Sequence, residues 1–570
     1  MKKEQTIPVY NQRRLFLLLL FVVAIALLMW RALDLQVINR DFLKNQGEAR
    51  YLRVVKIPAH RGMIMDRHGD ALAISTPVES VWVNPVDLVG QPDVLPRLAK
   101  ILNIKLDQLK QVLASRMNKE FVYLKRRVNP DIAKKVLDLQ AEGVFTQREF
   151  RRYYPAGEVA AHVIGFTNID DKGQEGVELA YNDWLRGSSG KKRVIKDRLG
   201  RIVGDVENIK ASRSGRDLYL SIDRRIQYLA YRELKKAVKY HRARSGSAVL
   251  LDVNTGEILA VVNQPSYNPN NRRGLSSSRY RNRAVTDVFE PGSTMKPFTI
   301  ATALESKKYT PSTIINTAPG RMKVGRNTIH DHSNYGKIDV THVITKSSNV
   351  GASKISLSLD AEKIWGLFTR VGFGTATASG FPGESSGLLS HYSRWHDIER
   401  ATLSYGYGLS VTPLQLAHAY SVIAANGISR PVSFIRQDSP VKGERAISAK
   451  VTRQLRKMMK TVVSAEGTGL KASVHGYQVA GKTGTIHKST SGGYADDRYI
   501  AVFAGMAPAS NPRLVLVVMI NEPRGDDYYG GLVAAPVFSK VMSGALRLMD
   551  VPPDNLPVIQ TKLNGRGGRS

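Results

Sequence analysis

Three short motifs place nucleophilic and basic side chains in a fixed order along the chain. They are Ser293-Thr-Met-Lys296, Ser347-Ser-Asn349 and Lys482-Thr-Gly484. In the first motif, lysine follows serine by three positions, a spacing that puts both side chains on one face of a helix. A serine hydroxyl beside an amine that can lose its proton is a nucleophile with its general base. The motifs therefore predict acyl transfer through a covalent serine intermediate.

Each motif alone is weak evidence, because the chain contains competing matches. Serines that also fit Ser-x-x-Lys or Ser-x-Asn are Ser188, Ser189, Ser439 and Ser266. The first two stand in a Gly/Lys-rich loop, Ser439 precedes a proline, and Ser266 lies before any suitable nucleophile. Only Ser293 follows a turn, Glu-Pro-Gly at 290–292, and precedes a helical run at 297–306.

The expected chemistry requires a lysine that is neutral near pH 7. At the start of a helix, Ser293 gains a backbone N–H and the positive helix end, which together stabilise an oxyanion. We expect burial and a nearby cation, Lys482, to lower the pKa of Lys296 toward neutrality. Ser347 and Asn349 can relay the proton and bind a substrate amide.

The third motif is suited to holding a peptide. Gly484 allows close backbone approach, so an extended peptide can add to an edge strand at 482–485. Thr483 and Thr485 are then placed to hold the terminal carboxylate of that peptide. No step in this scheme requires a cofactor or a metal.

Two other patterns suggest different chemistry and are rejected. Gly476 to Thr483 matches a phosphate-binding loop, but the residues that follow are poor helix formers and cannot supply the helix N-terminus that holds phosphates. His330-Asp331-His332 is interpreted as a polar turn, because an isolated triplet lacks further acidic ligands. The chain has no Cys, which excludes disulfides, thiol nucleophiles and cysteine-bound metals.

Apolar patterns predict the elements that position the motifs. A helix is expected at 224–242, a strand hairpin at 247–252 and 257–262, and a second strand pair at 499–505 and 513–521. A C-terminal helix is expected at 532–549. Strands at both ends, with mostly helical chain between them, predict an α+β domain whose sheet joins the two ends.

The N-terminal region predicts a membrane anchor. Residues 15–30 are an uninterrupted apolar run, and the run extends to residue 33 if Arg31 reaches back to the interface, close to the roughly 20 residues needed to cross a bilayer. Large residues at 27–30 leave no small-residue cleavage site, which favours an uncleaved anchor over a removed signal peptide. The excess of bases before residue 15 predicts a cytoplasmic N-terminus and an exported body.

The chain is long and strongly basic. Its 570 residues predict two to four domains, and 83 Lys and Arg against 49 Asp and Glu give a formal net charge of +34. Residues 191–244 contain 17 bases and six acids. This basic segment is either a solvated face or a contact with an anionic surface, wall polymer or phospholipid. Residues 208–215 are expected to form a linker, and Arg61 and 66–67 to brace the N-terminal region.

Taken together, the sequence resembles the class B penicillin-binding proteins, specifically the FtsI-type septal D,D-transpeptidases of Gram-negative bacteria. The resemblance covers nearly the whole exported chain, and the segments that carry it are 61–73, 151–166, 175–178, 245–260, 265–270, 286–297, 346–354 and 405–417. It implies a multidomain α+β protein with a transmembrane helix, an elongated pedestal domain of the dimerisation type, and a transpeptidase domain. The last is expected to be serine β-lactamase-like, with an antiparallel sheet flanked by helices.

The resemblance also implies domain bounds and roles. The bounds are 1–14 for a cytoplasmic tail, 15–33 for the anchor, 34–217 for stalk and pedestal, 218–552 for the transpeptidase domain, and 553–570 for a disordered tail. Ser293 is the implied acylated nucleophile and Lys296 its base, supported by Ser347, Asn349, Lys482 and Thr483. The backbone N–H groups of Ser293 and Thr485 are the implied oxyanion hole.

The implied activity is cross-linking of peptidoglycan stem peptides, with a D-Ala-D-Ala donor and β-lactams as inhibitors. A carboxypeptidase or β-lactamase, a non-catalytic scaffold or sensor, and a specialised paralogue of the septal enzyme are the alternatives. Expected partners are the inner membrane, a polytopic glycosyltransferase and other division proteins, but not nucleic acid. The body is expected in the periplasm.

Overall fold

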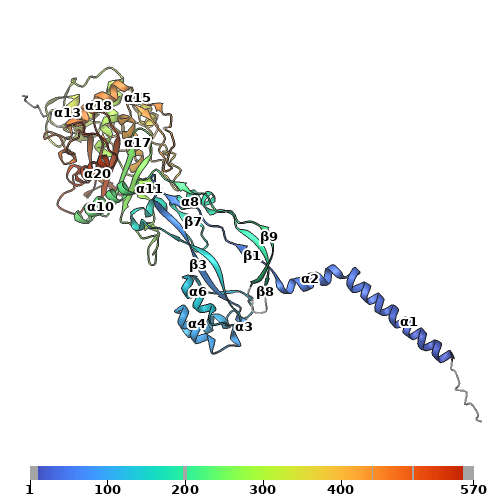
Figure 1. Ribbon diagram of the computed structural model, residues 1–570. Coiled ribbons are helices and arrows are strands. Elements are labelled where there is room, and N and C mark those ends of the chain that lie inside the picture. The colour runs from blue at the N-terminus through green and yellow to red at the C-terminus, as the bar shows by residue number, and fades with distance from the viewer. Residues whose placement is uncertain (1–10, 197–201, 440, 491–492, 556–570) are drawn as a thin grey trace, which may run out of the picture. The chain divides into compact units, whose positions relative to one another are not determined.

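The computed structural model describes residues 11–196, 202–439, 441–490 and 493–555 (Figure 1). These residues divide into two compact units. Unit 1 comprises residues 11–60, 77–151 and 187–214, and unit 2 comprises residues 61–76, 152–186 and 215–555. Most of the predicted cytoplasmic tail, and the predicted disordered tail from residue 556 onward, lie outside the described residues.

The apolar N-terminal run forms one helix that is long enough to span a membrane. Helix α1 (Asn11–Leu33) continues through a π-helical turn, η1 (Asp34–Ile38), and is followed by α2 (Arg40–Tyr51). Within Asn11–Ile38, the most apolar window of 18 residues has a mean hydropathy of 2.6, and that window packs against nothing in the described chain. The polar pattern of residues 34–55 predicts a helical stalk, but the helix ends at Tyr51, because residues 52–55 belong to strand β1 (Leu52–Ile57).

In unit 1, β1 belongs to an antiparallel sheet of three strands. The order is β1, β8 (Gly190–Lys196) and β9 (Ile202–Lys210). The linker predicted at 208–215 is therefore wrong in its first three residues, since Asn208 pairs with Lys192 and Lys210 with Lys191. Strand pairing uses backbone groups, so it can extend into a segment without apolar periodicity.

The rest of unit 1 is a small α/β layer. Past residue 77, β3 (Ala71–Val83) pairs with β4 (Val122–Val128), and β5 (Val144–Tyr153) follows. The helices are α3 (Pro85–Val89), α4 (Val94–Leu102), α5 (Leu106–Ala114) and α6 (Pro130–Leu137). Their apolar faces bury leucine and valine side chains such as Leu98, Leu109 and Val136 in one cluster.

The N-terminal segments of unit 2 are held together by a buried charge cluster. The guanidinium of Arg61 is fully buried and donates at 2.7 Å to one carboxylate oxygen of Glu178, while Arg152 donates at 2.6 Å to the other. Arg61 therefore braces this region, as predicted. The elements here are β2 (Ile64–Met65), η2 (Gly157–Val159), α7 (Ala161–Ile164), β6 (Phe166–Thr167), β7 (Gly173–Glu175), α8 (Gly176–Ala180), α9 (Asn182–Arg186) and β10 (Leu218–Tyr219).

The main sheet of unit 2 joins the two ends of the predicted α+β domain. Its order is β12 (Ile258–Gln264), β11 (Ser245–Asp252), β21 (Leu514–Asn521), β20 (Gly493–Ala507) and β19 (Ala480–Thr490), and each strand is antiparallel to its neighbours. The predicted hairpin and second strand pair are confirmed. The predicted strand ends lie within a few residues of the observed ones, except that β20 begins six residues before the expected start.

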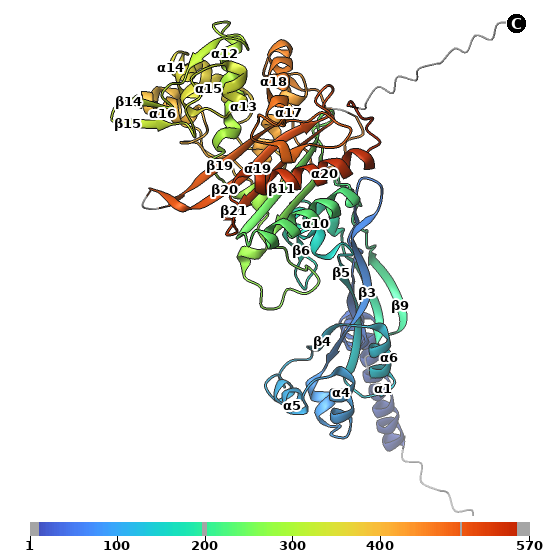
Figure 2. The same ribbon diagram turned by 90° about the vertical axis from the view of Figure 1, so that its left-hand side faces the viewer.

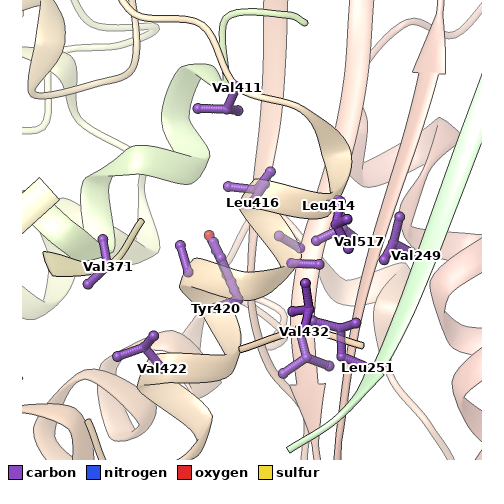
Figure 3. Close-up of a cluster of buried hydrophobic side chains, with 14 of the residues drawn as sticks. Val249, Leu251, Val371, Val411, Leu414, Leu416, Tyr420, Val422, Val432 and Val517 are labelled. Atoms are coloured by element: carbon purple, nitrogen blue, oxygen red, sulfur yellow. The ribbon is translucent and has the colours of Figure 1, made fainter. Parts of the chain in front are cut away.

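Both faces of this sheet carry apolar side chains, because helices cover each face and exclude water from it. Val249, Leu251 and Val517 point to one side, where α17 (Pro413–Ala424) packs with Leu414 and Tyr420 (Figure 3). Alternate residues of the same strands point to the other side. There α10 (Arg224–Tyr240) and α20 (Ala535–Leu548) cover the sheet (Figure 2). Both helices were predicted from their apolar spacing.

The chain between the two strand pairs is mostly helical, as expected. Its helices are η3 (Ser277–Arg279), α11 (Arg283–Thr286), η4 (Gly292–Met295), α12 (Lys296–Glu305), α13 (Val340–Thr345), α14 (Asn349–Leu357), α15 (Ala361–Arg370), η5 (Tyr392–Arg394), α16 (Asp397–Leu403), α17, α18 (Ala449–Thr461) and η6 (Leu470–Ala472). Short two-stranded ribbons are β13 (Ile314–Asn316) with β16 (Lys337–Asp339), β14 (Arg321–Val324) with β15 (Asn327–His330), and β17 (Ile428–Ser429) with β18 (Glu444–Arg445). Helix α19 (Gly530–Val533) precedes α20.

Candidate active site

The serine of the first motif lies in a turn that leads directly into a helix. Ser293 belongs to η4, and α12 begins at Lys296. The turn starts at Gly292, whose φ of +56° strains any residue with a side chain, and a Cβ there would lie 2.4 Å from Ile486 Cγ1. Glycine at 292 therefore lets strand β19 approach the nucleophile turn closely.

Lys296 connects the first two motifs. Its side chain is fully buried, and its Nζ lies 2.7 Å from Ser293 Oγ and 2.7 Å from Asn349 Oδ1. The same nitrogen lies 2.9 Å from the Ser347 carbonyl oxygen. A neutral amine has two N–H donors and one lone pair. It can therefore donate to the Ser347 carbonyl and the Asn349 amide oxygen while its lone pair faces the Ser293 hydroxyl.

The surroundings of Lys296 favour that neutral form. Burial, followed by the charge of Lys482, holds the pKa of Lys296 well below its ordinary value, and Asp331 acts in the opposite direction. Burial also lowers the pKa of Lys482 to about 7. When two amines are buried close to each other, protonation of both is unfavourable, because each charge is desolvated and repels the other. The predicted cause of the lowered pKa is therefore present.

Ser347 lies between the two lysines. Its Oγ is 3.2 Å from Lys296 Nζ and accepts a hydrogen bond of 2.9 Å from Lys482 Nζ. The backbone of Ser347 has a φ of +61°, which is uncommon for a residue with a side chain. This conformation ends the α13 segment and turns the chain into α14, which begins at Asn349. The hydroxyl thereby becomes a bridge between both amines.

Asp331 is a site residue that the sequence interpretation missed. Its carboxylate accepts hydrogen bonds from the Ser348 hydroxyl at 2.6 Å, from the backbone N–H of Val350 at 3.0 Å, and from the backbone N–H of Asn349. It caps the first turn of α14 and fixes the second motif. The triplet containing Asp331 was interpreted as a polar turn, and no local signal indicates that the chain returns to a helix start 18 residues later.

The third motif lies on the edge strand of the main sheet, as predicted. β19 pairs with β20 alone within the sheet, and carries Lys482, Thr483, Gly484 and Thr485. A Cβ at Gly484 would lie 3.2 Å from the Pro291 carbonyl oxygen, so glycine keeps the strand against the nucleophile turn. Lys482 is followed by the rest of strand β19 and not by a helix. The segment 480–490 therefore lacks the helix N-terminus that a phosphate-binding loop requires.

The two threonines of the strand are held differently. Thr483 Oγ1 lies 2.7 Å from Thr468 Oγ1, and Thr485 Oγ1 accepts a hydrogen bond of 3.0 Å from the backbone N–H of Gly530. That bond leaves the Thr485 hydroxyl proton free to be donated to a ligand. All eight residues proposed from the sequence thus belong to one connected region of unit 2.

A second missed residue stands just before the nucleophile turn. Glu290 accepts hydrogen bonds from the backbone N–H of Gly408 at 2.8 Å and from the Tyr494 hydroxyl at 3.0 Å. Burial raises the pKa of the Glu290 carboxyl. In the same loop as Gly408, the ring of Tyr405 lies 5.8 Å from Lys296 Nζ. Glu290 therefore ties the nucleophile turn to the loop beside Lys296 and to β20.

The geometry as a whole forms a relay from a half-exposed nucleophile to a buried amine pair. Contacts run from Ser293 to Lys296, from Lys296 to Ser347, and from Ser347 to Lys482. The hydroxyls lie nearer the surface than the amines, so a substrate can reach Ser293 while water is largely kept from Lys296. Such an arrangement is suited to nucleophilic attack by serine with amine general-base assistance.

Comparison with known proteins agrees with this geometry. Residues 246–543 match the penicillin binding protein transpeptidase domain, and residues 56–220 match the penicillin-binding protein dimerisation domain. The chain is 46% identical over 560 residues to peptidoglycan D,D-transpeptidase FtsI of Escherichia coli strain K12, covering 96% of this chain and 95% of the relative. It is 43% identical over 547 residues to probable peptidoglycan D,D-transpeptidase PenA of Neisseria gonorrhoeae, covering 95% of this chain and 94% of that protein.

A solved structure gives the same result for the catalytic part. The transpeptidase domain of penicillin-binding protein 3 from Burkholderia pseudomallei is 44% identical, with a TM-score of 0.55, and covers 59% of this chain and 98% of that one. The matched domains, the length of the similarity and the predicted motifs all agree. The chain belongs to the FtsI-type class B penicillin-binding proteins, with a dimerisation domain followed by a transpeptidase domain.

Proposed function

We propose that the protein is a peptidoglycan D,D-transpeptidase that cross-links stem peptides through an acyl-enzyme on Ser293 and is inhibited by β-lactams. The contact of 2.7 Å between Ser293 Oγ and the buried Nζ of Lys296 carries the proposal. Family membership supports the reaction class, and the geometry supports the role of each residue.

In the first step, Ser293 Oγ attacks the carbonyl carbon of the penultimate D-alanine, and its proton passes to Lys296 Nζ. The backbone N–H groups of Ser293 and Thr485 receive the oxyanion. The C–N bond then breaks, and the departing D-alanine nitrogen takes a proton from the relay of Lys296, Ser347 and Lys482. An ester between Ser293 and the donor peptide remains.

In the second step, an acceptor amine attacks the ester carbonyl. The amine loses a proton to Lys296, the C–O bond to Ser293 breaks, and the serine oxygen regains a proton. A new amide bond joins the two stems. Water in place of the amine would give a carboxypeptidase, so the ratio of transfer to hydrolysis with an added acceptor amine separates these two activities on the same site.

The donor peptide is proposed to lie along β19. The outer edge of that strand offers backbone groups to an extended peptide, and Gly484 leaves room for it. Asn349 is placed to hold a substrate amide. Thr483 and Thr485 are placed to hold the terminal carboxylate, and Lys482, which stays partly charged near its pKa of about 7, adds attraction for that anion.

The sharpest test of the site is covalent labelling by a fluorescent penicillin. Ser293→Ala should lose the label completely, because it removes the one motif serine that stands in the turn at the start of α12 beside Lys296. Intact-mass spectrometry of the wild type should show one added β-lactam, and peptide mapping should place it on Ser293. Full labelling of Ser293→Ala, with the adduct on another residue, would refute the assignment.

We propose further that α1 anchors the chain in the inner membrane, with the N-terminus cytoplasmic and the catalytic domain periplasmic. The unburied apolar helix and the bases before it support this orientation. The proposed bounds remain residues 15–33 for the anchor, 34–217 for stalk and pedestal and 218–552 for the transpeptidase domain. Protease added outside the inner membrane should degrade the body, and complete protection of the body would reverse the topology.

We also propose the septum as the place of action, with a polytopic glycosyltransferase and other division proteins as partners. The similarity to FtsI supports this assignment. Localisation of a fluorescent fusion in dividing cells tests it. Label spread evenly along the side walls would favour a specialised paralogue instead.

A further inference from the structure

A polar groove lies on the outer side of the two helices that cover the main sheet. We call it the α10–α20 groove, and it has a volume of about 930 Å³. Its walls include Arg232 and Lys236 of α10, Lys540 and Arg547 of α20, and the turn at 473–476. It is distinct from the active site, since none of the eight proposed site residues lines it.

The floor of the groove follows from tight helix packing. A Cβ at Gly544 would lie 2.4 Å from Leu229 Cδ2, so glycine lets α20 approach α10 at this point. On α10, positions 229, 232 and 236 share one face, and on α20, positions 540, 544 and 547 do the same. The flanking side chains therefore line a channel about two helical turns long, or roughly 10 Å.

The groove carries a net positive charge that the described chain does not neutralise. Its charged lining contains four Lys and Arg and one acid, Glu233. That acid is already shared, because Arg232 contacts it at 2.8 Å and Lys540 at 3.9 Å. Lys236 and Arg547 are exposed and form no ion pair within the described residues. Two cations thus remain for an external anion.

The rest of the lining selects for a polar ligand. Serines, glycines and an asparagine predominate, and only Leu229 and Val474 contribute apolar side chains. Hydroxyl and backbone groups suit a ligand rich in amides and hydroxyls, whereas acyl chains would need an apolar channel. The volume exceeds what one phosphate ion fills and lies at the upper end of the range of about 300–1,000 Å³ for pockets that hold drug-sized ligands.

We propose that the α10–α20 groove is a second, non-reacting binding site for carboxylate-bearing peptidoglycan, with Lys236 and Arg547 binding the carboxylates. The identity of the ligand rests on the proposed function, which makes peptidoglycan the polymer this protein meets. The site would hold a strand of the wall polymer while Ser293 reacts with another. It also gives a role to part of the basic segment at 191–244, which the catalytic site leaves unused.

The test uses the full-length chain in detergent, first acylated with penicillin so that the active site is blocked. Soluble peptidoglycan fragments released by a muramidase are titrated against it at low salt. The acylated wild type should bind the fragments, and Lys236→Glu combined with Arg547→Glu should weaken binding by about tenfold or more, since each exposed ion pair is worth up to about fivefold and the new acids repel the carboxylates. Fragments with amidated carboxylates should bind the wild type as poorly as the unmodified fragments bind the variant.

A matched control changes the same charge elsewhere. Arg453→Glu combined with Lys457→Glu alters two exposed bases on α18, outside the groove, and should leave binding unchanged. Equal loss in both double variants would overturn the site and leave only a general charge effect. Melting temperatures and the penicillin acylation rate confirm that each variant is folded.

The remaining outcomes separate the two proposals. If the wild type acylates normally but the acylated protein binds no fragments, the groove proposal fails and the proposed function stands. If penicillin does not acylate the chain, the proposed function fails, and the choice of peptidoglycan as ligand falls with it. Binding to vesicles of anionic phospholipid that depends on Lys236 and Arg547, without binding to fragments, would overturn peptidoglycan as the occupant.

Discussion

The Nζ of Lys482 donates a hydrogen bond of 2.9 Å to the hydroxyl of Ser347. The two residues are 135 positions apart, one on the edge strand of the main sheet and the other just before α14. Because Ser347 Oγ also lies 3.2 Å from Lys296 Nζ, one hydroxyl connects both buried amines. A change in the charge of either lysine is therefore felt by the other, and four predictions follow from this coupling and from its supports.

Lys296→Arg should fold but acylate slowly. Arginine keeps the positive charge and cannot lose its proton near neutral pH, so the general base is removed. Such assistance is worth roughly 10²–10⁴-fold. The measurement is the acylation rate constant for one β-lactam across pH, with the melting temperature followed in parallel. Acylation at the wild-type rate by a stably folded variant would refute the base role of Lys296.

Lys482→Met should move the acidic limb of the plot of acylation rate against pH to higher pH. Removing the neighbouring charge favours protonated Lys296, so the pKa of Lys296 rises and a higher pH is needed to free the base. Lys482→Arg is the matched control, because it retains the charge and should shift the limb far less. An unchanged limb in Lys482→Met would show that burial alone sets the pKa of Lys296.

The stability of Lys482→Met relative to the wild type should decrease as the pH rises from 7 to about 10. The pKa of Lys482 is about 7 in the folded chain and near 10.4 when unfolded, so the unfolded state binds more protons between these values. The wild type therefore gains stability as pH rises from 7 to about 10. The melting temperature of Lys482→Met relative to wild type should be highest near pH 7 and fall toward pH 10. A difference that stays constant over this range would contradict a neutral, buried Lys482.

Asp331→Asn tests the cap that fixes the second motif. Loss of the negative charge at the start of α14 should cost about 0.3–1 kcal/mol, because a carboxylate there interacts favourably with the helix N-terminus. Since Asp331 raises the pKa of Lys296, its removal should lower that pKa and move the acidic limb toward lower pH, opposite to Lys482→Met. Asp339→Asn, at the cap of α13, is a matched control for helix capping that should leave the limb in place. A shift in the same direction as Lys482→Met would refute the proposed effect of Asp331.

The sequence was most informative where chemistry or apolar spacing is local. Ser293 and Lys296 lie one helical turn apart, and the strands around 254–256 alternate between two buried faces, so their contacts follow from spacing. The helix at 224–242 was predicted from its local pattern, and the edge position of Lys482 was inferred from the Lys-Thr-Gly motif. The resemblance to a known family then connected motifs that spacing alone could not bring together.

The missed features depend on contacts between distant segments. Asp331 caps a helix that begins 18 residues later, and Glu290 meets Tyr494 across 204 positions. Neither contact leaves a local pattern in the chain. The linker predicted at 208–215 is wrong in part for a related reason, since residues 208–210 are held by backbone pairing with β8 while the side chain of Ile209 is exposed.

The strand order of the main sheet determines when the protein can become active during its synthesis. Strand β21 is the last in the chain, yet it lies between β11 and β20, and β19 attaches to the sheet only through β20. Until residue 521 has been made, the strand with Lys482 has no place on the sheet that supports the active site. Pairing over such a long separation is intrinsically slow to form. A growing chain is therefore an inert precursor, and the ability to react with a stem peptide or a β-lactam arises only after the sheet is closed.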